Sequence, residues 1–132
     1  MIDSPCSPSK YPILLRARDH ANPATLLAED VTFASPFAEY HGQADICHLF
    51  RLIGRVLTEP AIIGSASDGV WTYTSLTAKA DGHELEAVLR ERHDTDGRLV
   101  HATLWLRPYR SLRAAMDAMG RLLADTPLPS AR

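Results

Sequence analysis

The stretch KADGHELEAVLRERHDTDGRLVHATLWLRP, Lys79 to Pro108, decides the fold because it holds two turn signals between alternating segments. Asp81-Gly82 favours a two-residue type I′ hairpin, and residues 94–97 (DTDG) form a longer turn. Apolar and polar side chains alternate with a period of two around these turns, which is typical of strands with one buried face. We therefore predict consecutive antiparallel strands over 69–80, 83–94 and 98–107.

The two-residue turn fixes which residues face one another across the first hairpin. Counting outward from Ala80 opposite His83, one face holds these pairs: Ala78–Leu85, Leu76–Ala87, Thr74–Leu89 and Thr72–Glu91. This face carries most of the small and aliphatic side chains, so we take it as the inner one. The outer face then carries Trp71 opposite Arg92 and Tyr73 opposite Arg90. A shift of one residue in this register would exchange the two faces.

The rest of the chain supplies helices and further strands. The signals predict helices over 13–19, from Asn22-Pro23 to about 29, over 43–58, and from a capping Ser111 to about 123, with strands over 31–37 and 61–66. Residues 13–124 make one domain, between a disordered arm over 1–12 and a frayed tail over 125–132. Helices would then cover one face of a curved sheet, which is an α+β fold.

Composition and charge exclude several classes of function. The chain has 132 residues, a formal net charge of −2 and a pI near 6.3, so phosphate neutralisation cannot drive binding to nucleic acid or to an anionic membrane. The two cysteines lack CxxC spacing, and no secretory signal or apolar span is evident, which favours the cytoplasm. The six histidines form no metal motif and the glycines form no phosphate loop, so we expect neither metal nor cofactor.

Three segments, taken in succession, resemble the nuclear transport factor 2-like superfamily and within it the SnoaL-like group. They are LLAEDVTFASPF (26–37), the Tyr40-His41-Gly42 turn, and residues 83–108. The resemblance implies a cystatin-like, cone-shaped α+β barrel, in which a strongly curved antiparallel or mixed sheet wraps a long helix and encloses a pocket. Members often dimerise through the convex sheet face. Their functions include isomerases, polyketide cyclases, epoxide hydrolases and transport adaptors, so the fold does not fix the activity.

The catalytic sets of two enzymes with this fold do not match the sequence. Ketosteroid isomerase uses an Asp base before the proline that ends a strand, where this chain has Ser35, and a neutral Asp where it has Leu89. The first predicted helix contains no tyrosine to act as an oxyanion donor. The nearest tyrosine, Tyr11, lies before that helix. An Asp-Arg-Asp set like that of limonene epoxide hydrolase is also missing, because Arg90 and Arg92 point outward in the predicted register.

Two ionisable residues, Glu91 and His93, remain on the predicted inner face. A carboxylate and an imidazole two residues apart on one strand face can act as acid and base. SnoaL-type cyclases depend largely on one acidic residue, so the resemblance leaves this role open. The alternative is that both side chains lie solvated at the rim of the cone, or that Glu91 pairs with an arginine.

We weigh three hypotheses for the function. The first is a protein that binds a small, mostly apolar molecule; its pocket residues would be Phe33, Ser35, Phe37, Tyr40, Phe50, Leu76, Leu89, Ala102 and Leu104. The second is a polyketide-cyclase-like, isomerase-like or hydrolytic enzyme that uses His93 or Glu91 as the acid or base. The third is a dimerisation module that needs no ligand. A homodimer would use the outer sheet face: Trp71, Tyr73, Arg90, Arg92, His101, Thr103 and Trp105. A cone without a cavity of a few hundred Å³ would argue against the first two hypotheses.

Overall fold

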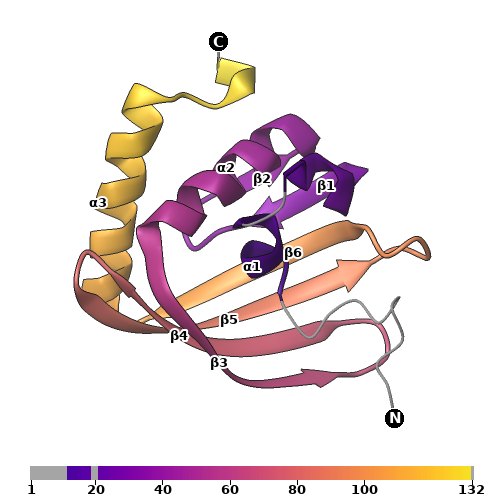
Figure 1. The fold of residues 1–132 in the computed structure, drawn as a ribbon, viewed down its shortest axis with the longest axis horizontal. Coiled ribbons are helices and arrows are strands. Elements are labelled where there is room, and N and C mark those ends of the chain that lie inside the picture. Colours follow the sequence, from indigo (N-terminus) through magenta and orange to yellow (C-terminus); the bar gives the residue numbers. More distant parts are fainter. Residues whose placement is uncertain (1–11, 19–20, 132) are drawn as a thin grey trace.

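A computed structural model describes residues 12–18 and 21–131, so most of the predicted N-terminal arm lies outside the described residues. These described residues form three α-helices and six strands (Figure 1). In chain order the elements are α1 (Ile13–Arg18), the 3₁₀ turn η1 (Pro23–Leu26), β1 (Leu27–Ala34), β2 (Glu39–His41), α2 (Gln43–Val56), β3 (Leu57–Ser67), β4 (Thr72–Ala80), β5 (His83–His93), β6 (Leu99–Arg107), α3 (Tyr109–Asp125) and η2 (Pro129–Ala131).

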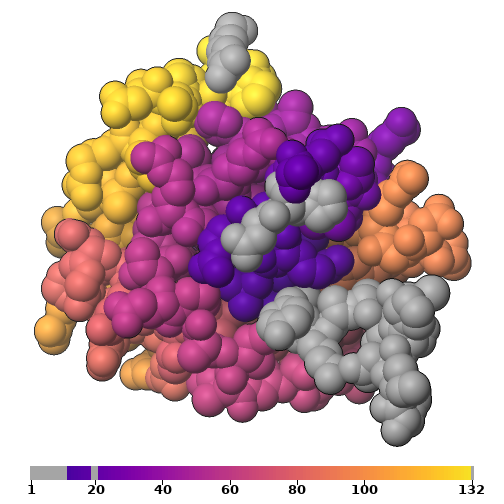
Figure 2. All heavy atoms as spheres, viewed as in Figure 1, coloured from indigo at the N-terminus to yellow at the C-terminus, as the bar shows by residue number. Residues whose placement is uncertain are grey.

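The strands form one curved sheet in the order β2-β1-β6-β5-β4-β3. Neighbouring strands run antiparallel except for β1 and β6, which are parallel, so the sheet is mixed. Figure 1 shows α1 and α2 lying across the concave side, with α3 along one end of the sheet. The space-filling view shows how closely the α1 and α2 segments lie against each other on this side (Figure 2). The predicted α+β class with helices on one face of a curved sheet is confirmed.

The predicted register of the central hairpin is confirmed. Ala80 pairs with His83 and Thr72 pairs with Glu91, so the inner and outer faces are as expected. Inner side chains such as Leu76 and Leu89 are at most 3% exposed. The turn succeeds because Asp81 and Gly82 both adopt positive φ, of 51° and 79°, as a type I′ turn requires.

Strand and helix boundaries differ from the prediction at several points. The second short helix ends at Leu26 and β1 begins at Leu27, because the apolar residues that follow pair with β6 instead of continuing a helix. Residues 39–41, expected to lie in a loop, form β2 against β1. α2 ends at Val56 rather than at about residue 58, and β3 begins at Leu57. Pro60 therefore lies within β3, where its missing N–H coincides with a break in the pairing with β4.

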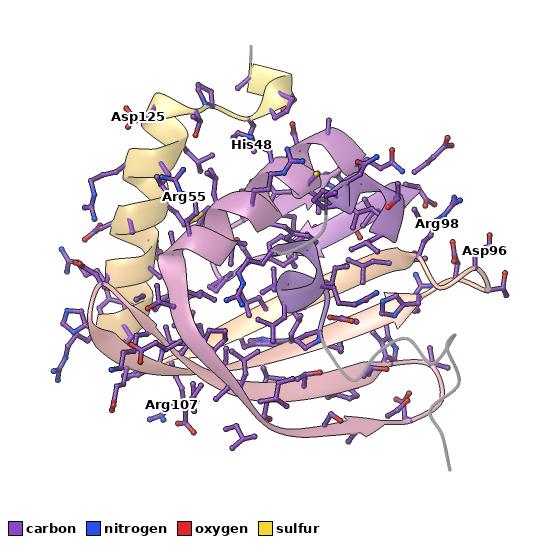
Figure 3. All side chains as sticks on the ribbon, viewed as in Figure 1. His48, Arg55, Asp96, Arg98, Arg107 and Asp125 are labelled. Atoms are coloured by element: carbon purple, nitrogen blue, oxygen red, sulfur yellow. The ribbon has the colours of Figure 1, made fainter. Side chains whose placement is uncertain are left out.

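The end of the chain also differs from the prediction. Ser111 does not cap α3, which begins at Tyr109; its buried hydroxyl instead donates a hydrogen bond to the carbonyl of Glu84. Residues 126–131, which belong to the predicted frayed tail, contact α2. Ser130 donates from its amide and hydroxyl to Asp45, at 2.9 and 2.6 Å. Nε2 of His48 lies 2.6 Å from the carbonyl of Thr126, and Figure 3 shows His48 extending toward this segment.

The core lies between the concave sheet and the helices. Phe33 of β1 and Phe50 of α2 meet edge to face, with ring centres 5.1 Å apart, and both are at most 1% exposed. Ile13 and Leu14 of α1 are buried in the same core, so α1 packs over the concave side of the sheet (Figure 1). Two candidate sites lie on the concave side: an apolar cavity lined in part by Phe33, and a group of buried ionisable residues next to α1.

Candidate functional site

An apolar cavity lies between α2, α3 and the inner face of β1 and β6. Its lining residues are Phe33, Ser35, Pro36, Phe37, Tyr40, Leu49, Ile53, Val56, Leu57, Leu104, Leu106, Leu112, Ala115 and Met119. The cavity has a volume of about 40 Å³, and the empty space in and around it, open solvent included, is about 460 Å³. The enclosed volume is below the few hundred Å³ expected for a pocket that encloses a whole drug-sized ligand, which argues against the first two hypotheses in that form. A ligand held here would therefore occupy the mouth as well.

The mouth of the cavity is shaped by the loop between β1 and β2. The Ser35 hydroxyl accepts hydrogen bonds from the amides of Phe37 and Ala38 and donates one to the carbonyl of Ala38. These bonds close a tight turn that presents Phe37 to solvent, 45% exposed. The Tyr40 ring stacks on Phe33, with centres 6.4 Å apart. Burial raises the pKa of Tyr40 from its ordinary value, and a hydrogen bond with Ser35 partly offsets this. The two hydroxyls are thus neutral at physiological pH.

The sequence-predicted pocket residues fall into two groups. Five of them line the cavity: Phe33, Ser35, Phe37, Tyr40 and Leu104. The other four are packed in the core behind it: Phe50, Leu76, Leu89 and Ala102. The prediction did not name the walls from α2 and α3, such as Ile53 and Ala115, although the apolar stripes of both helices were visible in the sequence. The stripe shows that a residue is buried and does not show whether it packs against protein or lines a cavity.

A second cluster gathers buried ionisable groups where α1 crosses β5. The Glu91 carboxylate is 3% exposed, and its Oε2 accepts a 2.6 Å hydrogen bond from the amide of Ile13 at the start of α1. Its Oε1 lies 3.5 Å from Nε2 of His93 and 3.9 Å from Nη2 of Arg16. The burial of Arg16 was not predicted from the sequence, because nothing in the ILLRARD segment distinguishes it from the neighbouring Arg18. The arrangement anchors α1 to the sheet.

Burial moves the two titrating groups of this cluster in opposite directions. It raises the pKa of Glu91 to about 7, although the Ile13 amide and Arg16 favour the carboxylate. It lowers the pKa of His93 to about 4, and the charge of Arg16 adds to this. At neutral pH His93 is uncharged and Glu91 is close to its midpoint, as an acid–base pair requires. Neither residue lines the apolar cavity, however, since Glu91 pairs with Ala102 and the cavity begins further along β6 at Leu104.

The outer face of the sheet carries a cluster of aromatic rings and arginines. The Arg90 guanidinium lies 4.3 Å from the centre of the Trp71 ring and 5.4 Å from that of Trp105. Arg92 approaches the same Trp71 ring, at 5.6 Å. The Trp105 side chain is 49% exposed, and Trp71 and Arg90 are partly buried. These contacts stiffen a large surface that the sequence predicted to face outward.

His101 extends this outer cluster toward β1. Its ring meets Trp71 edge to face, with centres 5.9 Å apart, and its two nitrogens lie within hydrogen-bond distance of the Thr32 and Thr103 hydroxyls. Burial lowers the pKa of His101, and the charges of Arg90 and Arg92 lower it further. The histidine therefore stays neutral, and the positive charge of this region belongs to the arginines.

Other kinds of site are not found in the part of the chain that the structure describes. Within residues 12–18 and 21–131, no three His, Cys, Asp or Glu side chains come close enough to hold a metal ion. None of the helices there combines the length and apolar character needed to cross a membrane. Cys47 of α2 is a free, buried thiol.

Comparison with solved structures identifies the fold. A steroid delta-isomerase from Pseudomonas aeruginosa matches with a TM-score of 0.77 and 29% identity, over 86% of this chain and 85% of that chain. A protein with a cystatin-like fold from Silicibacter pomeroyi matches with a TM-score of 0.78 and 21% identity, over 89% of each chain. A putative isomerase of the SnoaL-like family from Agrobacterium tumefaciens matches with a TM-score of 0.57 and 16% identity, over 73% of this chain and 92% of that chain.

The chain therefore shares the fold of cystatin-like and nuclear transport factor 2-like proteins. The resemblance seen in the sequence is thereby confirmed. No protein-family model matches this chain, and no curated protein matches it.

Proposed function

We propose that this protein binds the apolar end of a small molecule in the cavity between α2, α3 and the sheet. The supporting observation is the chemistry of the wall, which is aliphatic and aromatic apart from the Ser35–Tyr40 hydroxyl pair at its edge. An apolar group that leaves water for such a wall gains about 25 cal/mol for each Å² that it buries. The hydroxyl pair would orient one polar atom of the ligand at the mouth.

The wall favours binding over acid–base catalysis. No carboxylate or imidazole is among the residues that line the cavity. The steroid delta-isomerase from Pseudomonas aeruginosa suggests by its name an apolar, multi-ring substrate for a related protein. A molecule of that size exceeds the 40 Å³ interior, so we infer that a single ring or a short alkyl chain enters the cavity while the rest of the ligand stays in the mouth.

A pair of matched variants of α3 tests the binding. Ala115 lines the cavity and is 8% exposed, so Ala115→Met would fill the interior. Ala118 lies on the same helix, is partly buried and lines a separate surface groove, so Ala118→Met is the control. We expect cyclohexanol and 1-naphthol to raise the melting temperature of the wild type and of Ala118→Met, and to leave Ala115→Met unchanged. An equal response of Ala115→Met, or no response of the wild type, would contradict the proposal.

A second proposal, supported by the outer face, is that the protein is a homodimer. The exposed Trp105 ring and the partly buried Trp71 and Tyr73 rings lie on one surface of β4, β5 and β6. Aromatic residues and arginine are the residue types enriched in protein interfaces. Burying this surface against a second copy removes large rings from water without touching the concave cavity. Binding and dimerisation can therefore operate together.

A further inference from the structure

The outer face of β5 carries opposite charges at its two ends. Every second residue of the strand points outward, which gives the series Glu84, Glu86, Val88, Arg90, Arg92. Two acids precede Val88 and two arginines follow it at the same spacing. If a second copy of the series runs in the opposite direction, with Val88 opposite Val88, each acid lies opposite an arginine.

The arginines of this series have no acidic partner in the part of the chain that the structure describes. Neither Arg90 nor Arg92 forms an ion pair there, and both lie against the Trp71 ring. The Nε atom of Arg90 is buried and is without a hydrogen-bond partner among these residues. With no carboxylate of their own subunit paired with them, the two guanidinium charges can pair with carboxylates from outside the subunit.

The acids of the series remain available to a second copy. Glu84 is exposed and its carboxylate forms no ion pair within the described residues. Glu86 pairs with Arg107 through Oε1, at 2.5 Å, but both side chains are more than half exposed. Figure 3 shows Arg107 on the side of the sheet away from α2. Such an exposed pair contributes little, and Glu86 can exchange it for a pair across an interface.

Resting on the proposed homodimer, we propose that its two copies pack with β5 antiparallel across β5, about a two-fold axis through Val88. Glu86 then lies opposite the partner subunit's Arg90, and Glu84 lies opposite the partner subunit's Arg92. A two-fold axis along the strand would instead place each arginine over its own copy. Like charges facing one another across an interface cost several kcal/mol, so the charges select the axis perpendicular to the strand.

The neighbouring strands agree with this axis. Val88 pairs with Ser75 of β4 and with Trp105 of β6, so these residues form one row across the outer face. A two-fold axis along the row places Trp105 against the partner subunit's Trp105, and Ser75 against the partner subunit's Ser75. The largest exposed ring of the face is thereby covered at the centre, with opposite charges on both flanks. This matches the usual interface, which has an apolar middle and a polar rim.

Charge reversal in the full chain tests the orientation. Arg90→Glu/Arg92→Glu makes the series wholly acidic, and Glu84→Arg/Glu86→Arg makes it wholly basic. By analytical ultracentrifugation we expect each double variant alone to dimerise at least about 100-fold more weakly than the wild type. An equimolar mixture of the two should form a one-to-one heterodimer. The chain with all four changes has the reversed series, so it should dimerise again.

Controls separate this proposal from the dimer on which it rests. Arg110→Glu/Arg113→Glu alters the net charge as much as the acidic variant does, at two exposed positions of α3, and should leave the dimer intact. If replacing Arg90 unfolds the protein, the exposed pair Arg92→Glu and Glu84→Arg gives the same test by mixing. A monomeric wild type overturns both proposals. A dimeric wild type whose charge variants dimerise unchanged, without preference for the heterodimer, overturns the orientation alone.

Discussion

Nη2 of Arg16 lies 3.1 Å from Nε2 of His93, inside the junction between α1 and β5. A guanidinium can only donate, so Nε2 accepts with its lone pair and the proton of the neutral ring is on Nδ1. Protonation of His93 would place two cations in contact in a partly buried site. The carboxylate of Glu91 lies beside both groups and holds the first amide of α1. The stability of the α1 junction therefore depends on two linked titrations.

The pH dependence of stability should be nearly cancelled in the wild type. The pKa of Glu91 rises from 4.5 to about 7 in the native state, so its contribution is present below pH 4.5 and is lost as the pH rises through 7. The pKa of His93 falls from 6.5 to about 4, so its contribution is present above pH 6.5 and is lost as the pH falls through 4. Replacing one of these two residues should therefore reveal the pH dependence of stability that comes from the other. Relative to wild type, we expect His93→Gln to lose stability from pH 5 to 8 and Glu91→Gln to lose it from pH 7 to 4.

Urea unfolding at pH 4, 5, 6, 7 and 8, followed by circular dichroism, checks this expectation. His83→Gln is the control, because His83 is an exposed histidine at the other end of β5. Curves of the same slope for both variants would show that the two titrations do not oppose one another.

Glu91 should matter for stability mainly through the amide of Ile13. Glu91→Leu leaves that buried donor unpaired, and we expect it to lower the free energy of unfolding by about 2 kcal/mol. Glu91→Gln keeps a carbonyl oxygen for the Ile13 amide and should cost less. The exchange rate of the Ile13 amide hydrogen measures directly whether this hydrogen bond is lost. Faster exchange in Glu91→Leu but not in Glu91→Gln is the expected pattern, and equal protection in both would refute the anchoring role.

The loop at the mouth of the cavity should depend on one hydroxyl. Ser35→Ala removes the acceptor used by the amides of Phe37 and Ala38 and the donor to the Ala38 carbonyl. We expect a loss of about 1 to 2 kcal/mol in the free energy of unfolding. Exchange of the Phe37 and Ala38 amides should rise more than exchange in β2. A variant as well protected as the wild type would mean that packing alone shapes the loop.

The outer face gives a simpler prediction about Trp105. Trp105→Glu replaces the exposed ring with a charge at the centre of the proposed interface, and sedimentation should then show a monomer. Tyr109→Glu is the control, because Tyr109 is 72% exposed at the start of α3, outside the outer cluster. An unchanged dimer in Trp105→Glu would remove this face from the interface.

The sequence was sufficient where local chemistry determines structure. The Asp81-Gly82 turn set the register of β4 and β5, and the alternation along both strands then assigned their faces. β2 was missed because a strand as short as residues 39–41 has no period to detect, and its pairing with β1 is not local. The contacts of the tail could not be predicted because they depend on Asp45 and His48, about 80 residues earlier.

The candidate site could be predicted from the sequence less completely than the fold could. The alternation correctly placed Glu91 and His93 on the inner face, but it could not reveal that α1 covers them. In the same way, apolar patterning could not distinguish Leu104, which lines the cavity, from Leu89, which is packed behind it. Both distinctions depend on where the helices pack against the sheet.

The junction between α2 and β3 contains no linker. Leu57 donates its amide to the carbonyl of Ile53 as the last turn of the helix closes, and it also pairs with Ala80 as the first residue of the strand. Deleting a single residue here would turn the apolar stripe of the helix by about 100° and reverse the faces of the strand. Changes in chain length should therefore be tolerated at the exposed turns and excluded at this junction, where helix and strand share a residue.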